Sequence, residues 1–244
     1  MSIVKISIIT ATLNSANTLE ILIKSVIPHI SSKVEFIIID GKSSDGTVEI
    51  IKKYSNFLSY WETSLDSGIY EAFNKGIKVS RGEFICFVGS DDVLLDNYSN
   101  IYLDAIYKNT DRNYFSSKAI INKREVGKNF NYNQLKKGMK AVHPGSLHKK
   151  YLFNVHGFYN TFYKISSDYD FLVRCGSNLS NFFISKPTII IGANGISNLN
   201  YLLTLQEEYQ IKTNNNLNNF FSNVLNYFFA IVKKKIKNLF KNVF

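Results

Sequence analysis

The N-terminal part of the chain alternates between apolar, strand-length runs and longer amphipathic segments. The runs are rich in β-branched and aromatic residues, as buried strands are: Val4–Thr12, Val34–Ile39 and Phe84–Val88, with a weaker run at Phe57–Trp61. Helical patterns at 17–30, 47–54 and 69–79 separate them, the first opened by Asn17 and Glu20 at capping-box spacing. Strands separated by helices form right-handed βαβ units, so the pattern predicts an α/β fold with a mostly parallel sheet flanked by helices.

Acidic residues follow two of these strands. Asp40 comes after Val34–Ile39, and Asp91-Asp92 comes after Phe84–Val88. Parallel sheets bind ligands outside the carboxyl ends of their strands, so we expect both acid sites to face one crevice. Adjacent carboxylates can hold Mg²⁺ or Mn²⁺, and a carboxylate such as Asp40 can accept hydrogen bonds from a ribose or a base. From the residues alone, helix-start acids and an Asp-Gly turn are open alternatives.

The second half gives a less regular pattern. It predicts mixed short strands and loops in Asn113–Ala141, helices at Lys149–Val155 and Ser167–Cys175, a strand at Phe182–Ile191 interrupted at Pro187, and a linker at Thr213–Asn219. Successive helix positions point about 100° apart, so Asp168 and Asp170 cannot share one face. An aspartate that faces a cleft can serve as a general base, although a plain helix-start acid is an alternative.

The charge is uneven along the chain. The net charge is +10, and residues 220–244 hold five lysines and no acid. That distribution favours a local anionic partner over a general nucleic-acid coat. Apolar residues recur there at spacings of three or four, which predicts a basic amphipathic helix on an anionic membrane; packing against the domain or a second subunit is the alternative. The apolar positions are Phe221, Leu225, Phe228, Val232, Ile236, Leu239 and Val243.

Several protein classes fit poorly. The two cysteines form no CxxC pair, and no apolar run approaches the ~20 residues of a membrane span, so the sequence predicts a cytoplasmic protein that rests on the inner membrane face through its tail. The sequence contains no GxGxxG and no GxxxxGK[ST], which weakens the case for dinucleotide oxidoreductases and phosphate-loop NTPases. His143 and His148 lack the spacing of a metal signature.

Five blocks together resemble the family 2 glycosyltransferases, which have a GT-A (Rossmann-like) fold. The resemblance covers roughly residues 3–176, and the order and spacing of its blocks are specific to the family. The blocks are SIITATLN at 7–14, IIIDGKSSDGT at 37–47, DSGIYEAFNKGI at 66–77, RGEFICFVGSDD at 81–92, and HPGS at 143–146 with SSDYDFLVR at 166–174.

The resemblance implies a role for each matched position. Thr12 and Asp40 would contact the nucleobase, typically uracil, and Asn14 would support that pocket. Asp66 lies in a matched block on the donor side, and Lys75 is the candidate cation for the donor phosphates. Asp91 would bind ribose or a Mn²⁺ or Mg²⁺ cofactor, with Asp92 beside it on the metal, and Asp168 would be the catalytic base. The candidate acceptor-side residues are His143, Asp170 and Arg174.

Three positions depart from the family pattern. Gly89 replaces the first acid of the DxD motif, Phe73 stands before Asn74 where many members carry arginine, and Ser167 stands where a glutamate often precedes the base. These differences leave the donor preference open and keep a degenerate transferase, which binds without turnover, as an alternative.

The leading hypothesis is a metal-dependent inverting glycosyltransferase of bacterial lipopolysaccharide, O-antigen or capsule assembly. It would take a nucleoside-diphosphate sugar, UDP-linked in the first instance, and a glycan or lipid-linked glycan acceptor, with no nucleic-acid partner. The transferase domain would span 1–212 (nucleotide half 1–96, acceptor half 97–212), with a basic tail at 213–244 that could also pair subunits. The alternatives are a nucleotidyltransferase and a non-catalytic nucleic-acid or lipid-binding module.

Overall fold

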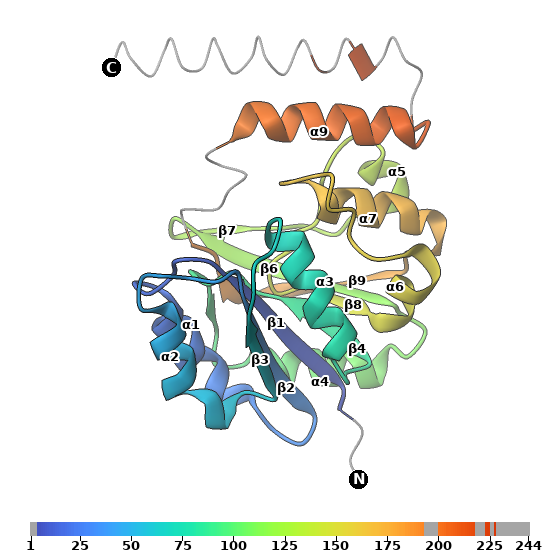
Figure 1. Ribbon diagram of the computed structural model, residues 1–244. Coiled ribbons are helices and arrows are strands. Elements are labelled where there is room, and N and C mark those ends of the chain that lie inside the picture. The colour runs from blue at the N-terminus through green and yellow to red at the C-terminus, as the bar shows by residue number, and fades with distance from the viewer. Residues whose placement is uncertain (1–3, 193–199, 218–222, 225–226, 228–244) are drawn as a thin grey trace, which may run out of the picture.

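Four parallel strands form the N-terminal half of the sheet, in the spatial order β3-β2-β1-β4. The computed structural model describes residues 4–192, 200–217, 223–224 and 227 (Figure 1). The strands are β1 (Ile6–Thr12), β2 (Val34–Asp40), β3 (Tyr60–Thr63) and β4 (Phe84–Phe87), connected through α1 (Leu19–Val26), α2 (Thr47–Lys53) and α3 (Ile69–Val79). The predicted βαβ alternation is therefore confirmed, with β3 placed later in the chain than the run at Phe57–Trp61.

The other half of the sheet is mixed, so the prediction of a mostly parallel sheet holds only for the first four strands. β8 (Leu147–Lys149) is antiparallel to β4 and β6 (Tyr114–Ile121), and β6 is parallel to β9 (Asn181–Ile190). The short strands β5 (Val93–Leu94) and β7 (Arg124–Val126) pair antiparallel with β9 and β6. The register shifts at Lys118, opposite Pro187, because proline has no N–H to donate to the ladder.

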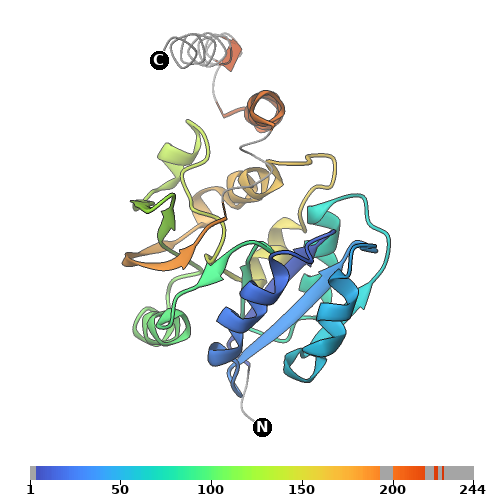
Figure 2. The same ribbon diagram turned by 90° about the vertical axis from the view of Figure 1, so that its left-hand side faces the viewer.

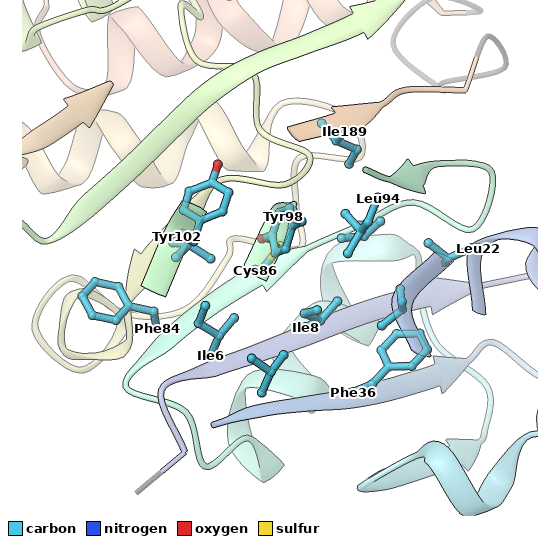
Figure 3. Close-up of a cluster of buried hydrophobic side chains, with 14 of the residues drawn as sticks. Ile6, Ile8, Leu22, Phe36, Phe84, Cys86, Leu94, Tyr98, Tyr102 and Ile189 are labelled. Atoms are coloured by element: carbon cyan, nitrogen blue, oxygen red, sulfur yellow. Dashed lines mark hydrogen bonds between the residues drawn. The ribbon is translucent and has the colours of Figure 1, made fainter. Parts of the chain in front are cut away.

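Helices cover both faces of the sheet. The remaining helices are α4 (Tyr98–Lys108), α5 (Tyr132–Leu135), α6 (Lys150–His156), α7 (Ser167–Cys175) and α9 (Tyr201–Asn214), with single 3₁₀ turns at Ile27–His29, Ser55–Phe57 and Gly176–Asn178. One core cluster joins the strands to α1 and α4; Figure 3 shows Ile6 and Ile8 of β1 packed with Tyr98 and Tyr102 of α4. The other cluster packs the opposite face against α3, α6 and α7. Alternate strand residues thus face different cores, as in a sheet buried on both sides.

The edge of the sheet at the amino ends of β1 and β4 is tightly packed. Buried Glu35 accepts hydrogen bonds from the Ser7 hydroxyl and from the backbone and guanidinium of Arg81. Gly82 approaches β1 so closely that an added Cβ would lie 2.6 Å from the Ser7 backbone nitrogen. The candidate site residues lie at the opposite edge, where the parallel strands end.

The predicted capping box at the first helix is wrong. α1 begins at Leu19 with Thr18 at its N-cap, and no side chain caps it. The Glu20 carboxylate instead accepts hydrogen bonds from the Tyr54 hydroxyl and the Lys53 ammonium, which joins α1 to the end of α2. Glu20 therefore binds residues about 33 positions away in the sequence, and not the backbone of its own helix start as the sequence suggested.

The C-terminal helix α9 packs on α7 rather than on the sheet (Figures 1 and 2). Tyr169 and Val173 of α7 form a small apolar cluster with Ile211 of α9 and with Tyr163. The helix runs to Asn214, so the segment predicted as a linker starts inside it. Among the described residues, no helix is long and apolar enough to cross a membrane. The predicted amphipathic helix of the tail lies outside the described residues.

Candidate active site

The ends of β1, β2 and β4 come together at one edge of the sheet, as the strand pattern predicts. The register pairs Thr12 with Asp40, and the Thr12 hydroxyl donates to Asp40 Oδ1 at 2.9 Å. The Ser15 and Ser90 hydroxyl oxygens lie 2.9 Å apart, which joins the loop after β1 to the turn after β4. Both acid sites therefore belong to the same edge.

Asp40 is completely buried, and protein donors surround its carboxylate. Oδ1 accepts from the Thr12 and Ser43 hydroxyls, and Oδ2 accepts from the Ser43 N–H at 2.9 Å and the Thr63 hydroxyl at 2.6 Å. Burial by itself raises the pKa of Asp40, but these hydrogen bonds outweigh it and lower the pKa below its usual value. In this conformation Asp40 ties three strand ends together, and its direct contact with a nucleobase stays a prediction.

Asn14 fastens the loop after β1 to the loop after β2. Its N–H donates to the Ser43 hydroxyl at 2.8 Å, and its Oδ1 accepts the Ser44 N–H at 3.0 Å. The φ angle of Asn14 is 50°, a left-handed value that asparagine tolerates better than most residues. Asn14 thus holds the two loops together, and its support of a nucleobase pocket stays a prediction. Asp45, to which no role was given, reinforces the same junction by accepting from the Ala16 N–H.

Asp66 lies against the end of β2. A Cβ added to Gly41 would come within 3.0 Å of Asp66 Oδ2, so the glycine leaves room for that carboxylate. Lys75 donates to the Ser64 hydroxyl at 2.9 Å and to the Leu65 carbonyl at 3.1 Å. The ammonium of Lys75 therefore holds the loop that carries Asp66, and its contact with donor phosphates stays a prediction.

The two acids after β4 have different surroundings. Asp92 is 2% exposed and accepts hydrogen bonds from the Gly89 N–H at 2.7 Å and the Gly192 N–H at 3.0 Å. Asp91 is half-buried, and its carboxylate accepts no hydrogen bond from the part of the chain that the structure describes. Gly192 lies directly against Asp91, since an added Cβ would overlap its Oδ2. Asp91 is the free carboxylate of this pair.

These two carboxylates fit a divalent cation that brings other ligands with it. Over the described ranges, no group of three or more acidic, histidine or cysteine side chains gathers as a metal site. Mg²⁺ and its relatives are commonly held by one or two carboxylates plus substrate phosphates and water, so Asp91 and Asp92 would suffice with a diphosphate donor. Burial raises the pKa of Asp92 to about 6, the Asp91 charge adds to this rise, and the two N–H donors oppose it.

The raised pKa of Asp92 predicts a pH-dependent stability. Because the pKa in the folded state (about 6) exceeds the usual 3.8, the folded protein binds this proton more tightly than the unfolded chain does. The stabilisation is complete below the unfolded value and is lost as pH rises through the folded one. Relative to Asp92→Asn, the wild type should therefore lose roughly 2 kcal/mol of unfolding free energy between pH 4 and pH 7. Denaturant titrations at several pH values measure it.

The control for this titration is Asp104→Asn, which changes an exposed acid of α4 that pairs with Lys108. Its difference from the wild type should stay nearly flat over the same pH range. An equally flat difference for Asp92→Asn would contradict the raised pKa.

Asp168 is the second residue of α7 and meets the start of α3. Its Oδ1 accepts the Tyr169 N–H at 2.8 Å and the Tyr70 hydroxyl at 3.1 Å. Oδ2 has no hydrogen-bond partner among the described residues. The N-terminal ends of both helices favour an anion at this point. The geometry suits a base that keeps one oxygen fixed and the other free.

The other acceptor-side candidates separate into two groups. His143 lies near enough for the Asp168 charge to act on it; its Nε2 is 2.9 Å from the Tyr159 hydroxyl, and its ring stacks on Phe87. Burial lowers the pKa of His143, and the Asp168 charge only partly offsets this, so the ring is neutral. Asp170 is buried and pairs with Arg174, whose guanidinium also donates to carbonyls of the loop after α6. This pair fastens α7 to that loop, and its contact with an acceptor stays a prediction.

Glu207 of α9 is a site residue that the sequence reasoning missed. It is 4% exposed and accepts hydrogen bonds from three successive backbone N–H groups, those of Lys164 (2.7 Å), Ile165 (3.0 Å) and Ser166 (2.8 Å). These residues lead directly into α7 and Asp168. A glutamate beside another glutamate in a polar helix gives no sequence signal for such a contact.

The fold and this edge define an α/β protein of the GT-A type, with carboxylates gathered beyond the ends of its parallel strands. The family model described as "Glycosyl transferase family 2" matches residues 7–169, which is more than half of the chain. The chain belongs to glycosyl transferase family 2.

Known proteins agree with that assignment. A Mycobacterium bovis protein named PGL/p-HBAD biosynthesis glycosyltransferase is 27% identical over 190 residues, 70% of each chain. The crystal structure of S. aureus TarS 1-349 in complex with UDP-GlcNAc matches with a TM-score of 0.71 and 18% identity, over 85% of this chain and 66% of that one. The mannosyltransferase PcManGT from Pyrobaculum calidifontis, in complex with GDP-Man and Mn²⁺, matches with a TM-score of 0.65 and 13% identity, over 85% and 62%. At these identities the structures show a shared fold, and about a third of each of those two chains has no counterpart here.

Proposed function

We propose that this protein is a metal-dependent inverting glycosyltransferase that moves a sugar from UDP to an acceptor hydroxyl. The observation that carries the proposal is the pair of carboxylates Asp91 and Asp168: among the described residues, Asp91 accepts no hydrogen bond, and Asp168 keeps Oδ2 open while its Oδ1 accepts two. Residues 64–70 link the two regions, because this segment places Asp66 against Gly41 and Tyr70 against Asp168. A donor held at the strand ends would therefore lie next to the base.

The proposed chemistry is a single displacement. Asp168 Oδ2 takes the proton of the acceptor hydroxyl, whose oxygen forms a bond to the anomeric carbon as the bond to the diphosphate breaks. Attack opposite the leaving group inverts the anomeric configuration. Asp91 and Asp92 would hold the Mn²⁺ or Mg²⁺ ion, whose chemistry is to neutralise charge on the departing diphosphate.

The choice of UDP rests on the fold neighbours together with the family resemblance. TarS is solved with UDP-GlcNAc, whereas PcManGT is solved with GDP-Man, so this fold accommodates more than one base. The Thr12, Asn14 and Asp40 cluster at the ends of β1 and β2 is where the base would lie. We place UDP first because the family resemblance implies uracil and because TarS is solved with both UDP-GlcNAc and UDP.

The segment between residues 112 and 166 is strongly basic in sequence, which supports an anionic or membrane-borne acceptor in bacterial lipopolysaccharide, O-antigen or capsule assembly. Between residues 112 and 166 the only acid is Glu125, against eleven basic residues: Arg112, Lys118, Lys123, Arg124, Lys128, Lys136, Lys137, Lys140, Lys149, Lys150 and Lys164. Together with the lysines of the tail, this charge favours a cytoplasmic protein bound peripherally to the inner membrane face. The alternative function of the tail is to pair two subunits.

The decisive test is nucleotide release from a panel of UDP-, GDP- and dTDP-sugars, with Mn²⁺ or EDTA. We expect Mn²⁺-dependent release of one diphosphate, UDP, and at least a tenfold higher Mn²⁺ requirement for Asp91→Asn. The control Asp96→Asn changes an exposed acid four residues from Asp92 and should behave as the wild type.

Failure of every donor to bind would contradict the proposal. Consumption of a nucleoside triphosphate would favour a nucleotidyltransferase, and salt-dependent nucleic-acid binding without turnover would favour a binding module.

A further inference from the structure

Tyr70 makes a contact with Asp168 that the proposed reaction does not by itself require. Its hydroxyl lies 3.1 Å from Asp168 Oδ1 and also donates to the Ile165 carbonyl, in the loop just before α7. Tyr70 is 7% exposed, and its ring packs against Phe73 and Tyr159. A buried hydroxyl held on both sides in this way has little freedom to turn elsewhere.

The hydroxyl stays protonated at any working pH. Burial raises the pKa of Tyr70 well above 10, and the negative charge of Asp168 acts in the same direction. The Tyr70 hydroxyl can therefore act only as a hydrogen-bond donor toward the carboxylate, not as a second base. The single O–H proton of Tyr70 is shared between the Ile165 carbonyl at 2.5 Å and Asp168 Oδ1 at 3.1 Å, and the Tyr169 N–H donates to the same Oδ1 at 2.8 Å. Oδ2 has no hydrogen-bond partner in the described part of the chain.

We infer that Tyr70 is a positioning residue that acts through Asp168, aiming Oδ2 at the acceptor hydroxyl. This inference rests on the proposed role of Asp168 as the base. Helix α3 would then serve the acceptor side through Tyr70, while the loop before it meets the donor side through Asp66.

The experiment is a double-mutant cycle with Tyr70→Phe and Asp168→Asn, read as kcat and donor KM. Tyr70→Phe keeps the ring and should lower kcat about tenfold, with the donor KM within about twofold. In the Asp168→Asn background the same change should alter the residual kcat by less than about twofold, because the group on which Tyr70 acts is already gone. A purely structural role would lower kcat by the same factor in both backgrounds.

Tyr98→Phe is the matched control. Tyr98 is also buried, lies on α4, and donates its hydroxyl to the Gly145 carbonyl at 3.0 Å, away from the carboxylate. Its loss should leave kcat within about twofold. Thermal melting and the stoichiometry of UDP binding correct every variant for its folded fraction.

The outcomes separate the two ideas. If Tyr70→Phe matches Tyr98→Phe, or lowers kcat equally in both backgrounds, the inference on Tyr70 is wrong while the proposed function stands. If Asp168→Asn is as active as the wild type, the proposed base is wrong and the inference falls with it. If the wild type turns over no donor with any acceptor, the proposed function fails first.

Discussion

Asp168→Asn should lower kcat by roughly 10³-fold while leaving donor binding nearly unchanged. Asparagine has the same shape, and its oxygen can still accept the hydrogen bonds from Tyr70 and the Tyr169 N–H. The amide nitrogen at the position of Oδ2 cannot take a proton, so the acceptor hydroxyl stays protonated. Steady-state rates measure the loss, and isothermal titration with UDP measures the donor affinity.

The control for this variant is again Asp104→Asn, the same chemical change on the surface of α4, where the carboxylate is 61% exposed. It should retain wild-type kcat. Retention of more than about a tenth of the activity by Asp168→Asn would mean that another group removes the proton. A loss of UDP binding in the same variant would show that Asp168 contributes to the donor site instead.

The parts of the fold that the sequence predicted are those whose signal is local. β1 and β2 are continuous apolar runs because both of their faces are buried, and α7 lies at Ser167–Cys175 as predicted. The crevice edge follows from parallel pairing, which places the ends of neighbouring strands together. Two acids after two strands were therefore enough to locate the edge.

The parts that could not be predicted depend on contacts between distant segments. The mixed half of the sheet is built from short strands such as β8 and β5, whose two or three residues carry no periodicity. The four hydrogen bonds to Asp40 include one from Thr63, which is brought in by β3, and Lys75 reaches the hydroxyl of Ser64 in the loop after β3. In each case the residue type permits the hydrogen bond, but the tertiary packing decides which partner it finds.

Glu207 is the strongest case of this kind, because its chemical importance comes wholly from where α9 lies. The sequence offers two adjacent glutamates, and a polar helix surface accounts equally well for both. Packing of α9 on α7 buries Glu207, whereas Glu208 stays half-buried and pairs with Lys212 at 3.4 Å. Glu207 thereby becomes the anion that orders the loop before the proposed base.

Glu207→Ala should lower the free energy of unfolding by roughly 3 kcal/mol, since three charge-assisted hydrogen bonds are lost, of which the one from Ser166 is buried and the other two are partly buried. The variant should also lower kcat at temperatures where it stays folded, because Ile165 of the same loop accepts the Tyr70 hydroxyl. Denaturant titration measures the first effect, and nucleotide release measures the second.

Glu208→Ala provides the matched control, one residue away on the same helix. It removes one partly exposed ion pair and should cost less than about 1 kcal/mol, with kcat unchanged. Equal losses of unfolding free energy from the two variants would mean that α9 is held by general packing. The Glu207 carboxylate would then contribute no more to stability than that of Glu208. A stability loss confined to Glu207→Ala, together with a fall in kcat, would show that the C-terminal helix sets the loop from which Asp168 works.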